Sequence, residues 1–127
     1  MNHDLPALGD AYLKARDKKE PEGISKFLHP DVRFIGPMQQ VTGKEKVLQA
    51  AQRVFGLLKT LELRSRFVSG DQALFTYDFV CADPVGLCRT AELLTFNNGL
   101  ITRIEFFFHA RPFEKLMQTQ KAVPKSA

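Results

Sequence analysis

Glu92 is the residue whose type and setting point most directly to chemistry. It alternates with Leu94 and Phe96 along a predicted strand, so its carboxyl group shares a face with two bulky apolar side chains. A carboxylate in such a setting loses its hydration, which favours the protonated acid. A protonated acid in a pocket can donate a hydrogen bond or transfer a proton. The alternative is that Glu92 meets a cation at the rim of the sheet, for example Arg64 or Arg66.

These two interpretations of Glu92 predict different costs for its replacement by leucine. In a pocket, Glu92→Leu removes a desolvated acid and should cost little stability, unless it leaves a buried partner without its opposite charge. A structural salt bridge predicts that the same change lowers the stability of the fold.

Asp78 and Tyr12 are the other two candidates for a catalytic role. Asp78 lies in the middle of a predicted strand, where aspartate is unfavourable, on the face opposite the aromatic side chains. Either it acts in a pocket beside Glu92, or it forms a cross-strand ion pair with Arg89 or Arg103. Tyr12 lies on the apolar face of a predicted helix. Its hydroxyl there can donate to an oxyanion or be satisfied within the core.

A ligand cavity also needs an apolar lining. The candidates are bulky side chains predicted to face inward, together with a histidine at the end of the last strand whose ring titrates near neutrality. They are Phe34, Phe55, Leu94, Phe96, Phe106, Phe108 and His109. The phenylalanines could instead fill the interior, which would leave a non-catalytic binding or protein-interaction module.

The sequence shows no pattern for metal, cofactor or nucleotide chemistry. His3, His29 and His109 have no ligand spacing with the two cysteines, and no glycine-rich phosphate loop or nucleophile elbow is visible. We therefore expect no cofactor and no bound metal. Cys81 and Cys88 flank a turn-like stretch, and we expect reduced thiols rather than a cross-strand disulfide.

Length and charge restrict the class of protein. The chain has 127 residues, enough for one domain, of which 44% are hydrophobic and 25% charged. The net charge is +4, but four basic residues against one acid lie in residues 111–127, so the rest has almost no surplus. We therefore expect no nucleic-acid partner. Apolar runs are too short for a membrane span and the first residues lack a signal-peptide pattern, so we expect a cytoplasmic protein.

Three segments in the N-terminal half have apolar residues at helical spacing. The first helix starts after Asp4 and carries Tyr12 on its apolar face. A second, short helix starts at Pro21 and carries Leu28 inward before His29 and the following proline end it. The third follows Thr42-Gly43-Lys44-Glu45, which has the spacing of a capping box.

Alternating apolar residues predict strands in the remaining segments. These strands cover residues 32–35, 61–67, 73–81, 87–96 and 100–109. Short turns join the last four, which forces antiparallel neighbours. The expected fold is therefore α+β, with a cone-shaped, curved antiparallel sheet packed on three helices.

The predicted domain covers residues 1–117, followed by a flexible tail over 118–127.

The last strands carry Leu93, Ile101 and Phe107 on the face away from the helices. This face is too apolar to leave in water, so we expect a homodimer through the sheet.

Several stretches together resemble a known family. They are the tyrosine-bearing helix, the segment Lys26-Phe27-Leu28-His29-Pro30-Asp31-Val32, the capping-box segment, and Thr95-Phe96-Asn97-Asn98-Gly99-Leu100-Ile101-Thr102-Arg103-Ile104-Glu105. Their order is similar to that of the SnoaL-like, ketosteroid-isomerase-like branch of the nuclear-transport-factor-2-like superfamily. The resemblance implies a cystatin-like α+β roll with a small apolar or aromatic molecule in the cone. It also allows acid/base chemistry of the isomerase or cyclase type.

The resemblance assigns roles to some of the candidate residues. Tyr12 falls at the place of the first-helix tyrosine that donates to the oxyanion in ketosteroid isomerases. Glu92 falls at the place of their second donor, a carboxylic acid. Their base is an aspartate before a proline, and that position here is Gly36. The resemblance therefore implies the oxyanion half of such a site without its base, with Asp78 and His109 as candidate substitutes.

Overall fold

The computed structural model describes residues 4–115, and their elements follow the predicted order except for one additional short strand, β2. They are α1 (Leu5–Asp17), α2 (Pro21–Ser25), β1 (Leu28–Ile35), β2 (Gln40–Thr42), α3 (Lys44–Phe55), β3 (Leu58–Ser69), β4 (Gln72–Cys81), β5 (Leu87–Asn97) and β6 (Leu100–Phe108). A further helical turn covers residues 111–115. The tail predicted over 118–127 lies outside the described residues.

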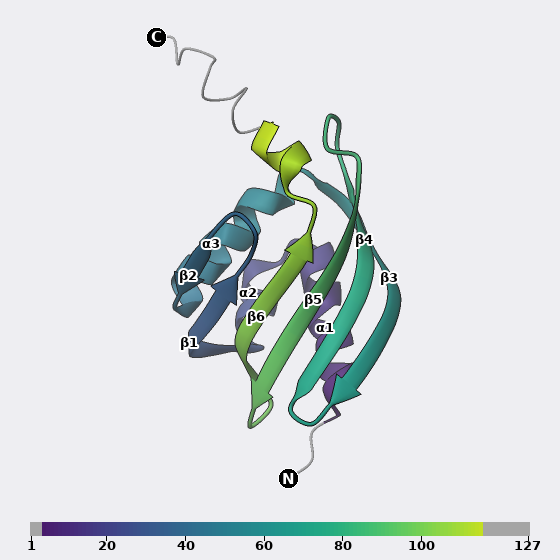
Figure 1. The fold of residues 1–127 in the computed structure, drawn as a ribbon. Coiled ribbons are helices and arrows are strands. Elements are labelled where there is room, and N and C mark those ends of the chain that lie inside the picture. The colour runs from purple at the N-terminus through teal and green to yellow at the C-terminus, as the bar shows by residue number, and fades with distance from the viewer. Residues whose placement is uncertain (1–3, 116–127) are drawn as a thin grey trace.

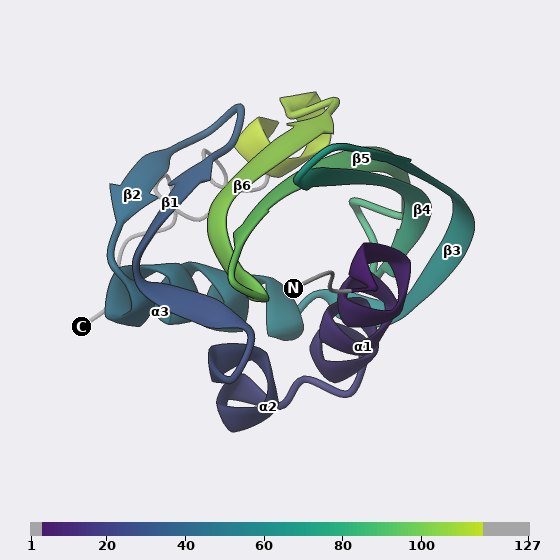
Figure 2. The same cartoon turned by 90° about the horizontal axis from the view of Figure 1, so that it is seen from below.

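The strands of this region form one curved sheet in the order β2-β1-β6-β5-β4-β3. Strands β3 to β6 are an antiparallel meander, as their short connections require. Strands β1 and β6 pair in parallel, so the sheet is mixed rather than antiparallel throughout. No short turn joins these two strands, so their relative direction was not constrained by the sequence. The three helices lie on the concave side of the sheet and close a cone with it (Figures 1 and 2), which confirms the predicted α+β architecture.

Helix α1 approaches the sheet closely because of one glycine. The helix begins at Asp4, whose side chain accepts a hydrogen bond from the amide of Ala7 at 3.1 Å. One turn further on, a Cβ atom at Gly9 would collide with the ring of Phe75 on β4. That ring is completely buried and has nowhere to move. Glycine at this position therefore sets the spacing between helix and sheet.

Two predicted element boundaries are wrong. Helix α2 ends at Ser25, and Leu28 already pairs with Ile101 of β6, because the residues around the following proline are forced into an extended conformation. The capping box is also not formed. Thr42 is the last residue of β2, and Gly43 is the N-cap of α3 without any side-chain hydrogen bond.

Ile101 lies on the inner face of β6, not on the outer face that strict alternation predicts. It is completely buried in the core. The pairing of β5 with β6 shifts between Thr95, which faces Arg103, and Phe96, which faces Ile101. One residue of β6 is therefore extra, and a bulge of this kind reverses the inward and outward alternation on the bulged strand.

Both cysteines, Cys81 and Cys88, are free and buried on adjacent strands. Burial raises the pKa of each thiol, so a smaller fraction of each cysteine is present as the reactive thiolate at neutral pH.

Among the residues that the structure describes, no helix has both the length and the hydrophobicity needed to cross a membrane.

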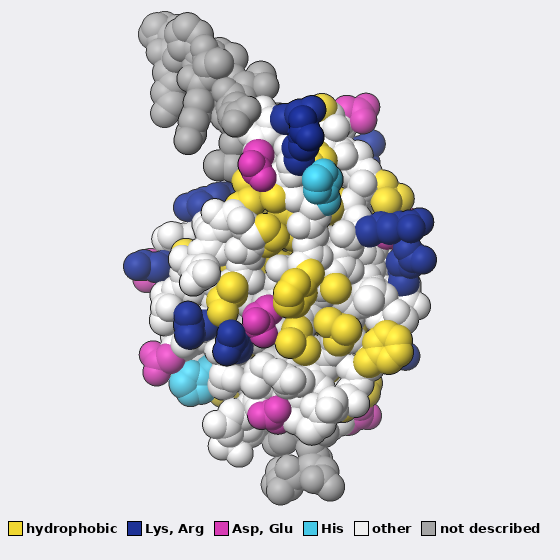
Figure 3. Space-filling view, in the orientation of Figure 1, with side chains coloured by type: hydrophobic (Ala, Val, Ile, Leu, Met, Phe, Trp, Pro, Cys, Tyr) yellow, Lys and Arg dark blue, Asp and Glu magenta, His cyan; other side chains and the backbone are white. Residues whose placement is uncertain are grey.

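The outer face of the sheet is apolar across several strands. Phe67 on β3 faces Leu74 on β4, which in turn faces Leu93 on β5. Phe107 on β6 continues the surface, and Phe67 and Phe107 are 61% and 53% exposed. Figure 3 shows apolar side chains gathered over the middle of this face. Such a contiguous patch is typical of a protein–protein interface.

We expect this outer face to form the interface of a homodimer. Phe107→Glu should then give a monomer, because it places an unpaired charge in a buried interface at a cost of several kcal/mol. Static light scattering at micromolar concentration measures the mass of both proteins. Val68→Glu is the matched control, since Val68 is 47% exposed but pairs with the inner-face residue Ala73. A monomer of the unaltered chain would contradict the prediction.

Candidate functional site

A buried ion pair joins the first helix to the middle of the sheet. Nη2 of Arg16, on α1, donates to Oε2 of Glu92, on β5, at 2.6 Å, and Nη1 contacts Oε1. Only 6% of the arginine side chain and 0% of the glutamate side chain are exposed. Two parallel charge-assisted hydrogen bonds of this kind are among the strongest that side chains make.

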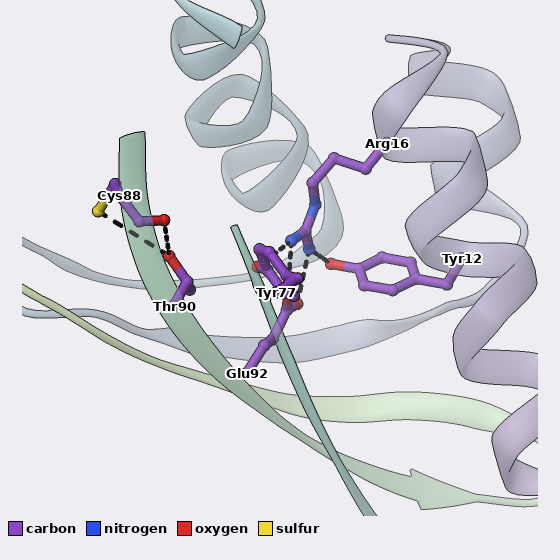
Figure 4. A network of polar contacts seen from close by, with 6 residues as sticks. All are labelled: Tyr12, Arg16, Tyr77, Cys88, Thr90 and Glu92. Carbon is purple, nitrogen blue, oxygen red and sulfur yellow. Dashed lines mark hydrogen bonds and ion pairs between the residues drawn. The ribbon is translucent and has the colours of Figure 1, made fainter. Parts of the chain in front are cut away.

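Both tyrosines of the chain complete this arrangement (Figure 4). Tyr77 on β4 donates to Oε1 of Glu92 at 2.6 Å and accepts from Nη1 of Arg16 at 3.0 Å. Tyr12 on α1 accepts a hydrogen bond from Nη2 of Arg16. The guanidinium carbon also lies 4.6 Å from the ring centroid of Tyr12 and 4.9 Å from that of Phe106. We call Tyr12, Arg16, Tyr77 and Glu92 the Arg16 cluster.

Local spacing explains how the four residues meet. Tyr12 and Arg16 are four residues apart, so they lie on the same face of α1. Glu92 pairs with Phe75, which precedes Tyr77 by two residues on the same face of β4. Tyr77 and Glu92 are therefore diagonal neighbours on the inner face, within reach of long side chains. The close approach of α1 brings both halves together.

The cluster carries no net charge at neutral pH. Loss of hydration raises the pKa of Tyr12 and of Tyr77 well above the usual value, and the Glu92 carboxylate raises both further. Desolvation alone would lower the pKa of Arg16, but Glu92 and the two tyrosines together outweigh it and raise that pKa. The cluster therefore consists of one guanidinium, one carboxylate and two neutral hydroxyl groups.

An apolar cavity with a volume of about 120 Å³ lies beside the Arg16 cluster, and Tyr12 and Arg16 belong to its lining. Five phenyl rings form much of the remaining surface. They are those of Phe34, Phe79, Phe106, Phe108 and Phe113. Helix α3 contributes the small side chains of Val47, Ala50, Ala51 and Val54. The cavity is thus mainly apolar, with the donors of α1 at its edge.

The structure brings some of the predicted lining residues to this cavity and not others. Phe34, Phe106 and Phe108 line it, as Tyr12 does. The other predicted lining residues lie elsewhere: Phe55, Leu94 and Phe96 pack in the core, and His109 is exposed. His109 follows the last residue of β6, so the strand does not hold its ring over the cavity.

Asp78 is not brought together with Glu92. It lies on the outer face of β4, where its carboxylate is 3.7 Å from Nη1 of Arg64 and 3.8 Å from Nε of Arg89. The ion pair with Arg89 is one of the alternatives raised by the sequence. The sheet separates Asp78 from the cavity, because successive side chains of a strand point to opposite faces.

The residue that meets Glu92 is Arg16, and the sequence analysis missed it. Arg64 and Arg66, the expected partners at the rim, contact Asp78 and Asp10 instead. One signal for Arg16 was present: it falls one helical turn after Tyr12, so it continues the buried face of the helix. Tyr77 lies on the inner face of β4, and no local pattern in the sequence indicates its contact with Glu92.

We expect Glu92→Leu to lower the free energy of unfolding by about 3–5 kcal/mol, because it leaves the buried Arg16 charge without a partner. This corrects the expectation that the change costs little. Arg16→Met should cost a similar amount, and the double variant should recover much of the combined loss, since both charges are then gone. Urea denaturation of the four proteins gives the coupling energy. Single-variant costs below about 1 kcal/mol, as for an exposed pair, would contradict this account.

Tyrosine ionisation reports directly on the Arg16 cluster, since the chain has two tyrosines and no tryptophan. In the folded protein we expect neither tyrosine to ionise near pH 10, whereas both should do so in the urea-unfolded chain at about pH 10. Above that pH only the unfolded state releases these protons, so stability is full below about pH 10 and falls as the pH rises. Tyrosinate absorbance during an alkaline titration measures this. A folded-state midpoint near pH 10 would contradict the burial of the hydroxyl groups.

Solved structures with the same fold cover most of the chain. A protein from Kribbella flavida aligns with a TM-score of 0.82 and 21% identity, over 92% of this chain and 96% of that one. A candidate polyketide cyclase from Sinorhizobium meliloti aligns with a TM-score of 0.75 and 21% identity, over 82% and 96%. A protein with a ketosteroid isomerase-like fold from Catenulispora acidiphila, in complex with trimethylamine, aligns with a TM-score of 0.74 and 14% identity, over 84% and 88%. Identities this low establish a shared fold alone.

Sequence comparison identifies the family. No curated protein matches the chain significantly. The model of the SnoaL-like domain matches residues 10–104, a stretch that contains the whole Arg16 cluster. With the structural neighbours, this match confirms the resemblance inferred from the sequence motifs. The chain therefore belongs to the SnoaL-like domain family.

Proposed function

We propose that the protein binds one small, neutral, largely apolar molecule, about the size of a single ring, in the cavity beside the Arg16 cluster. The observation that carries the proposal is a phenyl-lined cavity of about 120 Å³ next to hydrogen-bond donors. An engineered apolar cavity of about 150 Å³ binds benzene, which sets the scale. The Catenulispora acidiphila protein of similar fold is in complex with trimethylamine, likewise a small molecule. We further propose that the binding protein is a cytoplasmic homodimer, as predicted from the sequence.

The charges around the cavity favour a neutral ligand. Arg16 is the one charged side chain among the described lining residues, and Glu92 neutralises it. A charged ligand would lose its hydration without meeting a free opposite charge. The hydroxyl of Tyr12 keeps its proton and accepts from Arg16, so it adds no charge to the cavity lining.

The lining favours binding over proton abstraction. Among the described residues that line the cavity there is no aspartate, glutamate or histidine. Glu92 is completely buried and committed to Arg16 and Tyr77. Acid/base catalysis by Glu92, Asp78 and Tyr12 would therefore lack a group placed to remove a proton from the ligand. The cavity also leaves space between the phenyl rings, which argues against a filled interior.

Phenol and toluene are suitable probes for this proposal. A ligand present at ten times its Kd stabilises the fold by about 1.4 kcal/mol, which raises the Tm by about 5 °C for a domain of this size. Ala51→Leu fills the cavity from α3 and should abolish the increase. Gln52→Leu, the neighbouring exposed residue of the same helix, is the matched control and should keep it.

Two outcomes of the thermal denaturation series would contradict the proposal. The first is an unaltered protein whose Tm does not rise with either probe at any concentration up to the solubility limit of the probe. The second is a rise that persists in Ala51→Leu, since that rise would come from a site outside the cavity.

A further inference from the structure

The C-terminal turn contributes one phenyl ring to the cavity wall, and this ring does not come from a strand. Phe113 lies on the helical turn of residues 111–115, which follows β6 (Figure 1). Its ring contacts that of Phe108 edge to face, with the centroids 5.3 Å apart. The turn is closed by a hydrogen bond from the amide of Glu114 to the carbonyl of Ala110 at 2.9 Å.

The remaining phenyl rings are fixed by the sheet itself. Phe34, Phe79 and Phe106 come from strands β1, β4 and β6. Their rings touch one another, with centroid distances of 5.1 Å between Phe34 and Phe106 and 6.4 Å between Phe79 and Phe106. Moving any of them would disturb the core, where packing is dense. Phe113 instead lies outside the sheet and is only partly buried, so its ring can be removed without breaking a strand ladder.

We propose that Phe113 is the residue that restricts the ligand to one ring, by closing the cavity at the end where β6 leaves the sheet. This inference rests on the proposed binding function. The cavity has room for about one ring, and the phenyl group of Phe113 itself occupies about the space of one ring. Its removal therefore extends the cavity to the length of two fused rings. The native ligand class is accordingly monocyclic, and bicyclic molecules are excluded by contact with Phe113.

The test compares phenol with 2-naphthol, which carries the same hydroxyl on two fused rings. The unaltered protein should bind phenol at least about tenfold more tightly than 2-naphthol, because the added ring would overpack the cavity. Phe113→Ala should bind 2-naphthol at least about tenfold more tightly than the unaltered protein does. Phe113→Leu, a smaller truncation, should fall between them and replaces the alanine variant if that protein does not fold.

Glu114→Ala is the matched control, since it changes an exposed residue of the same turn and leaves the ring in place. Binding of 2-naphthol is followed by its own fluorescence, which no tryptophan of this chain obscures. In Phe113→Ala, nuclear Overhauser effects between 2-naphthol and the Phe108 ring should locate the second ring in the vacated space. A merely loosened turn would not produce them.

The outcomes separate this inference from the proposed function. If the unaltered protein binds neither phenol nor toluene, the proposed function fails, and the role of Phe113 fails with it. If it binds phenol, but 2-naphthol binds equally well or gains no affinity in either Phe113 variant relative to Glu114→Ala, the role of Phe113 alone is overturned.

Discussion

The bidentate pair of Arg16 with Glu92 is the constraint on which the arrangement of this molecule depends. A guanidinium and a carboxylate can be buried only if each meets the other and the remaining polar atoms find partners. Helix α1 must therefore lie at one height and one rotation over β4 and β5. Gly9 makes the close approach possible, and Tyr12 and Tyr77 supply the additional hydrogen bonds.

The same pair determines the chemical character of the cavity. Glu92 is bound by Arg16 and Tyr77, so its oxygen atoms are occupied within the Arg16 cluster. The polar groups that line the cavity belong to Tyr12 and to Arg16, whose charge is neutralised by Glu92, and phenyl rings surround them. The fold alone does not decide the function, because function depends on the side chains placed in the cone.

Local periodicity in the sequence was enough to determine the order of the elements apart from the short strand β2, and much of their orientation. Helical spacing placed Tyr12 on the buried face of α1, and strand alternation placed Glu92 on the face of Leu94 and Phe96 and Asp78 on the face opposite the aromatic side chains. It did not decide whether Asp78 faces the pocket. Short turns determined the antiparallel meander from β3 to β6. These features follow from the geometry of a helix or a strand over a few residues, so they can be predicted without knowing which distant residues are in contact. The family motifs could be recognised for the same reason.

Only the tertiary structure decided which residues meet across the cone. Arg16 and Glu92 are separated by 76 positions, and no local pattern indicates that one buried charge will neutralise the other. The inward turn of Ile101 depends on a bulge, and the parallel pairing of β1 with β6 depends on a connection that spans about half of the chain. The cavity itself is the space left after five rings from four separate segments have packed. The size and shape of this cavity depend on the volumes and positions of all the surrounding side chains, and these positions are fixed only in the folded molecule.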